Sequence, residues 1–169
     1  MNDREPFTAE LRVSSEDTYK TATLRGKHEL VADEPTWLPG GLAGHDDHPA
    51  PVDYLVMSLA SCQVSVLVQC LERNGVDTYR IECNAVVDEY YRDDDHPEEM
   101  PPHTALRLGH ITVEMVLTTT AAYRDQADQC LITYDQGCIV GQSLSGGIDY
   151  TPLTALEIVD SPLGTVDEQ

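Results

Sequence analysis

Lysine is scarce in this 169-residue chain, in which Lys20 and Lys27 are the only two lysines. Lysine and arginine together number 10 against 30 aspartates and glutamates, so the formal net charge is -20. A nucleic-acid-binding surface needs clustered Lys or Arg to displace counterions from phosphates, and the sequence has no such cluster. The composition therefore argues against a nucleic-acid partner.

The excess of acidic residues also bears on the environment of the protein. At molar ionic strength the Debye length falls to about 3 Å, which screens repulsion that would be strong in ordinary salt. We therefore predict a cytoplasmic protein of a halophilic archaeon. An acidic protein that binds a basic partner is the alternative, but the acidic residues are scattered along the chain and not confined to one tail.

Signals for secretion and for zinc binding are also missing. The five cysteines form no CxxC pair and are too widely spread for a secreted disulfide scaffold. The first residues, MNDREPFTAE, hold no apolar run, so we expect neither a signal peptide nor a transit peptide. The length suits one domain over residues 1–169, and a hydrophobic fraction of 41% is enough for one core.

The central part of the chain predicts a long helix. Pro51 and Asp53 are typical of a helix N-terminus, and the segment over residues 52–73 carries no charge between Tyr54 and Leu71. Apolar residues occur on every face, so we expect a buried helix. A membrane-spanning helix is the weaker alternative, because serine and glutamine dilute the segment and no basic residues flank it.

The remaining segments predict an α+β arrangement of antiparallel sheets and helices. Alternating apolar residues indicate two or three strands over residues 7–33 with a turn or bulge at Gly26, and the proline-rich stretch that follows is a loop. The other predicted elements are strands over 79–91 and 106–120 joined by an exposed hairpin tip, a helix over 123–136 that Gly137 ends, a short helix from Cys138, and an edge strand over 150–159.

Two cysteines occupy positions suited to different roles. Cys62 lies in the middle of the apolar helix, where a cysteine is commonly a small buried hydrophobe. Cys138 follows Gly137 and begins a helical turn whose amides could stabilise a thiolate.

Three motifs together resemble the OsmC/Ohr family. PAPVDYLVMSLASC around Cys62 and GCIVGQSLSGG around Cys138 are similar to the two cysteine segments of that family. LRGKHELVADEPTWLPGG is similar to the RxH…DEP…GG segment of an OsmC-like branch. The resemblance covers most of residues 22–148, and the predicted element order agrees with the family's order.

The resemblance implies an intertwined homodimer in which antiparallel sheets pack around long central helices, with active sites at the subunit interface. It also implies a thiol peroxidase without a cofactor, in which Cys62 attacks the O–O bond and becomes a sulfenic acid and Cys138 closes a disulfide with it. A lipoylated or thioredoxin-like dithiol would reopen that disulfide. Arg25 is the candidate cation that keeps Cys62 ionised, and Asp53 takes the place of the glutamate that holds the arginine in the family.

The remaining cysteines and the histidines allow alternative interpretations. Cys70 and Cys130 lie eight residues from Cys62 and Cys138, so a second redox pair is an alternative to ordinary core thiols, and Cys83 is expected in the core. A metal site built from the loop His45–His48, with His96 and His103 elsewhere, is disfavoured because no helical scaffold fixes its geometry. His28 is expected to be a hydrogen-bonded strand histidine.

The sequence thus favours a peroxidase for organic hydroperoxides, with hydrogen peroxide as the poorer substrate, because the surroundings of Cys62 are apolar. A redox-sensing or small-molecule-binding protein of the same fold, without catalysis, is the second hypothesis, since the family's glutamate is absent.

Overall fold

The computed structural model describes residues 7–13, 19–37, 44–91 and 106–147, and the predicted hairpin tip and edge strand lie outside these ranges. The elements in chain order are β1 (Ala9–Arg12), β2 (Lys20–Leu24), β3 (His28–Ala32), α1 (Pro51–Arg73), β4 (Tyr79–Tyr91), β5 (Leu106–Thr119), the 3-10 turn η3 (Ala121–Tyr123), α2 (Arg124–Thr133), the 3-10 turn η4 (Tyr134–Gly137) and α3 (Ile139–Gly146). The predicted α+β class and element order are confirmed.

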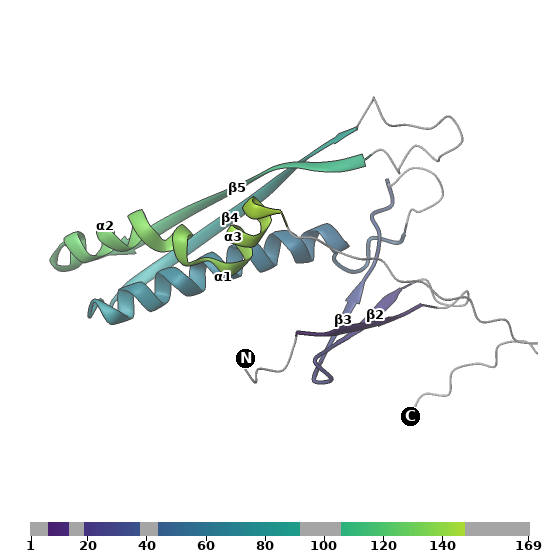
Figure 1. Ribbon diagram of the computed structural model, residues 1–169, viewed down its shortest axis with the longest axis horizontal. Coiled ribbons are helices and arrows are strands. Elements are labelled where there is room, and N and C mark those ends of the chain that lie inside the picture. The colour runs from purple at the N-terminus through teal and green to yellow at the C-terminus, as the bar shows by residue number, and fades with distance from the viewer. Residues whose placement is uncertain (1–6, 14–18, 38–43, 92–105, 148–169) are drawn as a thin grey trace, which may run out of the picture.

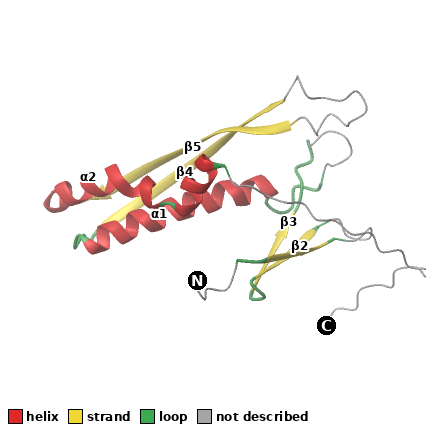
Figure 2. Ribbon diagram, in the orientation of Figure 1, coloured by secondary structure: helices red, strands yellow, loops and turns green. Residues whose placement is uncertain are grey.

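The long hairpin of β4 and β5 forms one antiparallel sheet, and α1, α2 and α3 lie along it (Figure 1). Side chains along both strands alternate between half-buried and exposed, as expected for a sheet that is covered on one face. A register shift between Val87 and Glu89 marks a β-bulge. The small sheet β1-β2-β3 is also antiparallel and lies near the N-terminal end of α1 (Figure 2).

Local signals define both ends of α1. Pro51 is in the first turn, and the Ala50 N–H donates to Asp53 Oδ2 at 2.7 Å. At the other end Gly75 takes a positive φ of 73°, and the Val76 N–H donates to the Leu71 carbonyl at 3.0 Å. This is a Schellman ending, and it carries Val76 into the core.

The core of the helical layer lies between the C-terminal half of α1, α2 and the hairpin. Its buried members are Leu67, Leu71, Val76, Ala127 and Cys130. Each large apolar side chain that is fully buried there contributes roughly 1.5–3 kcal/mol to folding.

The expectation that α1 is buried on every face is wrong for the single chain. Only Leu59, Leu67 and Leu71 are buried, whereas Met57 is 55% exposed. The reason is that the hairpin, α2 and α3 cover one side of the helix and leave the other side open. By length and composition α1 could span a membrane, the one such helix in the described ranges, but the core helix of a soluble protein meets the same criterion.

Candidate functional site

The structure brings Cys62 and Cys138 together. Cys62 lies in the middle of α1 and is partly exposed, and Cys138 is the N-cap residue of α3 and is fully buried. Both are free thiols, and the Cys138 thiol is hydrogen-bonded to the sulfur of Cys62. Two residues that are 76 positions apart in the sequence therefore share one site.

The N-terminus of α3 points its backbone amides at these sulfurs. The amides of Ile139 and Val140 donate to Cys62, and the Gly141 amide donates to Cys138 Sγ at 3.2 Å. The next amide, that of Gln142, donates to the Cys138 carbonyl at 2.9 Å. The first amides of a helix have no partners within the helix, so the two sulfurs serve as their acceptors.

These contacts affect the two thiols in opposite directions. Burial raises the pKa of Cys62, but the amides of Val140 and Ile139 and the Cys138 thiol outweigh it, so the pKa is lowered. Burial raises the pKa of Cys138, and the neighbouring Cys62 raises it further against the Gly141 amide. Cys62 is therefore the more readily ionised thiol of the pair, and Cys138 is the hydrogen-bond donor to it.

Close packing holds the segment before α3 against α1. A Cβ at Gly137 would lie 2.8 Å from Val66 Cγ1, so only glycine allows this approach. The Cys138 N–H donates to the Asp135 carbonyl at 3.2 Å, and Gln142 Nε2 donates to the same oxygen at 3.3 Å. Gly137 thus sets the distance between the two cysteine-bearing segments.

An open cleft of about 440 Å³ lies beside the cysteine pair. Gly141 lines the cleft and also borders Cys138, because a Cβ at Gly141 would be 3.3 Å from Cys138 Sγ. Leu59, another lining residue, lies against Gly141 on the same side, 3.4 Å from that Cβ position. Its other lining residues are a mixture of polar and apolar groups: Gln63, Gly109, His110, Ile111, Val113, Tyr134, Leu144 and Ser145. The cleft therefore presents both apolar and polar groups close to Cys138.

The structure places the two charged residues predicted for the site elsewhere in the single chain. Arg25 is at the β2–β3 turn with φ 53°, and its guanidinium lies 5.5 Å from the ring centroid of Phe7. Asp53 caps α1, nine residues before Cys62, or about 13 Å along the helix. Neither is among the groups that shift the pKa of Cys62. Their roles at the active site stay predictions.

Cys70 and Cys130 form a disulfide with a Cα–Cα distance of 5.7 Å, so the prediction that both are ordinary core thiols is wrong. Cys70 lies on the face of α1 that meets α2, and Cys130 lies on the face of α2 that meets α1. The sequence does not reveal that these two faces meet. Cys83 is exposed and not in the core. It shares its face of β4 with Ile81, but in this chain the helices do not cover it.

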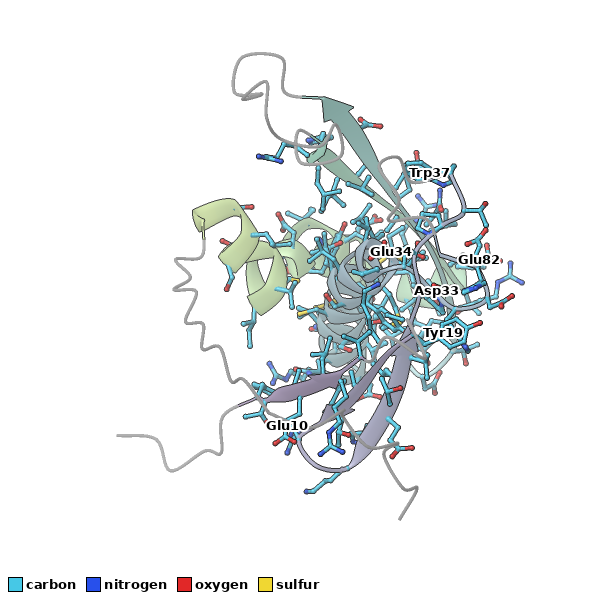
Figure 3. All side chains as sticks on the ribbon, turned by 90° about the vertical axis from the view of Figure 1, so that its right-hand side faces the viewer. Glu10, Tyr19, Asp33, Glu34, Trp37 and Glu82 are labelled. Carbon is cyan, nitrogen blue, oxygen red and sulfur yellow. A yellow bond between two sulfur atoms is a disulfide. The ribbon has the colours of Figure 1, made fainter. Side chains whose placement is uncertain are left out.

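The loop after β3 is organised by Asp33, a residue to which we assigned no role from the sequence. Asp33 is 1% exposed, and its carboxylate accepts from the backbone amides of Glu34, His45 and Asp47. Burial raises the pKa of Asp33, but these amides and nearby His45 outweigh it, so the pKa is lowered. Figure 3 shows Asp33 beside Glu34, with Tyr19 close by.

The histidines of this loop contact an aromatic ring. His45 and His48 both pack edge-on against Tyr19, whose hydroxyl donates to Asp47 Oδ2 at 2.9 Å. Within the described ranges no group of three or more His, Cys, Asp or Glu side chains is arranged to hold a metal ion, and His96 and His103 lie outside them. His28 is exposed at the start of β3.

Residues 44–152 match the family model described as OsmC-like protein, which covers more than half of the chain. The chain belongs to the OsmC-like family. The match includes both cysteine segments and the long hairpin between them. No curated protein matches the chain by sequence.

Solved structures of OsmC-like proteins share the fold. An organic hydroperoxide resistance protein from Elizabethkingia anophelis superposes with a TM-score of 0.63 at 15% identity, covering 88% of this chain and 94% of that one. A protein from Legionella pneumophila, described as organic hydroperoxide resistance protein OsmC and predicted redox protein, has a TM-score of 0.60 at 14% identity, covering 88% and 95%. An OsmC-like protein of unknown function from Vibrio cholerae has a TM-score of 0.57 at 12% identity, covering 83% and 94%.

Proposed function

We propose that this OsmC-like protein is a thiol-dependent peroxidase that reduces organic hydroperoxides. The observation that carries the proposal is the contact between a thiolate-forming Cys62 and a thiol at Cys138. Family membership and the hydroperoxide resistance proteins among the structural neighbours support a redox role.

The reaction begins at Cys62. Its thiolate attacks the terminal oxygen of ROOH, an S–O bond forms, the O–O bond breaks, and the alkoxide takes a proton to leave as ROH. The amides of Ile139 and Val140 hold the attacking sulfur as a thiolate without a neighbouring cation in the described part of the chain.

Cys138 then resolves the sulfenic acid. Its sulfur attacks the sulfur of Cys62–SOH, an S–S bond forms, and the hydroxyl leaves as water with the proton of the Cys138 thiol. An external dithiol, lipoylated or thioredoxin-like, reduces this disulfide by exchange and is itself oxidised to a disulfide. No cofactor takes part in this scheme.

The cleft beside the pair supports a preference for organic hydroperoxides. Its lining includes Leu59, Ile111, Val113 and Leu144, which suit an alkyl or aryl group better than water. We therefore expect a higher kcat/KM for cumene hydroperoxide than for hydrogen peroxide.

The experiment follows loss of cumene hydroperoxide with dihydrolipoamide as reductant, in molar KCl. Parent protein should turn over many times, Cys62→Ser should be inactive, and Cys83→Ser, which alters a cysteine outside both pairs, should match the parent. Equal turnover by Cys62→Ser and parent would show that the activity does not belong to this thiol.

The second candidate is a redox-sensing or small-molecule-binding protein without turnover. It is favoured by the position of Arg25, which packs on Phe7 and does not contribute to the pKa of Cys62 in the single chain. In that case hydroperoxide would oxidise Cys62 once, and dihydrolipoamide would not restore the thiol. Cytoplasmic location and assembly as a homodimer are part of the proposal.

A further inference from the structure

The chain has two cysteine pairs that join the same two segments. One segment is α1, which carries Cys62 and Cys70. The other runs from α2 through η4 to α3, with Cys130 in α2 and Cys138 as the N-cap residue of α3. Cys70 is bonded to Cys130, and Cys62 contacts Cys138. The segments therefore run antiparallel, fixed by a covalent bond at one point and meeting at the site at another.

The disulfide is shielded from solvent on the side of Cys130, whereas Cys70 is half-buried. Cys130 is 0% exposed within the core cluster, and Cys70 packs against that cluster. Asn74, at the C-cap of α1, donates from Nδ2 to the Cys70 carbonyl at 2.9 Å and reaches Cys70 Sγ at 3.5 Å and Cys130 Sγ at 3.6 Å. Thiol–disulfide exchange requires a thiolate to reach one of the sulfurs, and the burial of Cys130 together with the Asn74 amide over both sulfurs restricts that approach.

The two pairs are too far apart to exchange electrons directly. Eight residues separate Cys62 from Cys70, which on a helix is about 12 Å of rise, whereas exchange needs the sulfurs in contact. The role of the disulfide is therefore geometric.

The geometry it controls is the approach of Cys138 to Cys62. Only residues 131–137 separate Cys130 from Cys138, and the last of them, Gly137, packs directly on Val66 of α1. A closed disulfide limits how far this short connection can move from α1. Limiting that motion raises the effective concentration of one thiol at the other.

We propose that the Cys70–Cys130 disulfide holds Cys138 opposite Cys62, and that it stays closed while a dithiol reopens the Cys62–Cys138 pair. Cys70, Cys130 and Asn74 are thus positioning residues for the resolving step. The link to that step rests on the proposed peroxidase function, but the positioning itself can be measured without hydroperoxide.

The first test is the equilibrium between the Cys62–Cys138 pair and dithiothreitol redox buffers. Cys70→Ala/Cys130→Ala should lower the equilibrium constant for disulfide formation about tenfold, which makes the potential about 30 mV less negative. Cys83→Ala, which removes a cysteine outside both pairs, should leave the potential unchanged. An unchanged potential in the double variant would overturn the proposal.

Alanine at the buried position 130 would leave a cavity in the core. A second variant, Cys70→Ala/Cys130→Val, fills this volume, and its Cys62–Cys138 potential should shift in the same direction. The parent protein gives an independent measurement. With both pairs oxidised, dihydrolipoamide followed by iodoacetamide and mass spectrometry should label Cys62 and Cys138, with Cys70 and Cys130 labelled only when urea is present during the reduction. Opening of both pairs at the same rate in native protein would contradict the inference.

A peroxide measurement then joins the inference to the function. After one equivalent of cumene hydroperoxide, the double variant should close the Cys62–Cys138 disulfide about tenfold more slowly and accumulate sulfenic acid at Cys62. The first oxidation of Cys62 should keep the parent rate. If parent Cys62 does not react with hydroperoxide at all, the proposed function fails, while the dithiothreitol equilibrium still decides the positioning role.

Discussion

The pKa of Cys62 is lowered by neighbours from a different part of the chain. Burial on α1 acts against ionisation, and the amides of Val140 and Ile139 with the thiol of Cys138 outweigh it. Backbone amides at a helix N-terminus carry partial positive charge, so they replace part of what a cationic side chain would supply. The pair is therefore chemically unsymmetrical before any substrate binds.

Iodoacetamide should modify Cys62 ahead of the other free thiols at pH 7. The midpoint of its pH profile should lie below the midpoints of Cys83 and Cys138, because the pKa of Cys62 is lowered while the pKa values of Cys83 and Cys138 are raised. Peptide mass spectrometry at a series of pH values gives the profile. Cys138→Ala removes one donor and should shift the Cys62 midpoint upward. A Cys62 midpoint equal to that of Cys83 would contradict the assignment.

Asp33→Asn should lower the melting temperature at pH 7, because an amide oxygen replaces two carboxylate oxygens that accept three backbone N–H groups. The pKa of Asp33 is lowered in the folded protein. Its stabilising effect is therefore present above the unfolded value of about 3.9 and is lost as the pH falls through the lowered value.

Calorimetry from pH 7 to pH 3 should accordingly show the gap between parent and Asp33→Asn narrowing in acid. Asp46→Asn changes an exposed carboxylate of the same loop and serves as the control, with a melting temperature close to that of the parent. A gap that stays constant across this pH range would mean that the charge of Asp33 is not what matters.

At the level of elements, η4 and α3 owe their place on α1 to the absence of a side chain at residue 137. The β-branched Val66 faces that position and has little rotamer freedom on a helix. Gly137 therefore does more than end a helix, which is the role we predicted for it from the sequence.

Gly137→Ala should destabilise the protein by about 1–3 kcal/mol, since the new Cβ would overlap Val66 Cγ1 and push η4 away from α1. Urea unfolding measures the change. Gly146→Ala, where a Cβ meets nothing within 4 Å, should cost no stability. Closure of the Cys62–Cys138 disulfide should also slow in Gly137→Ala. Equal unfolding midpoints for the two variants would show that the contact with Val66 adapts freely.

For the whole molecule, the open side of α1 and the acidic surface have opposite effects on association with a second copy of the chain. Met57 is 55% exposed and Val86 52%, and both line an open cleft between α1 and β4. Exposed apolar area of this kind favours association with a second copy, whereas a net charge of -20 on each chain opposes it.

We therefore expect sedimentation equilibrium in molar KCl to give twice the chain mass of 18.7 kDa. Lower salt should shift the protein toward the single chain, because the Debye length grows from about 3 Å at 1 M to about 10 Å at 0.1 M and exposes the repulsion. A single-chain mass at micromolar concentration in molar KCl would rule out the proposed homodimer.

Much of the fold was predictable because local rules define it. Pro51, Asp53 and Gly75 set the ends of α1, alternation of apolar residues predicted β4 and β5, and Gly137 marked the start of α3. Each of these signals depends on a few neighbouring residues, so no tertiary structure is needed to interpret them. Family resemblance then singled out Cys62 and Cys138.

What the tertiary structure alone decided is which faces of these elements meet. It bonded Cys70 to Cys130, left Cys83 and one side of α1 exposed, and aimed the amides of α3 at Cys62. Such outcomes depend on how helices pack across the hairpin, and the sequence spacing of two residues does not determine the distance between their side chains once the chain folds back. The sequence determined the elements and the reactive residues, and packing determined their chemistry.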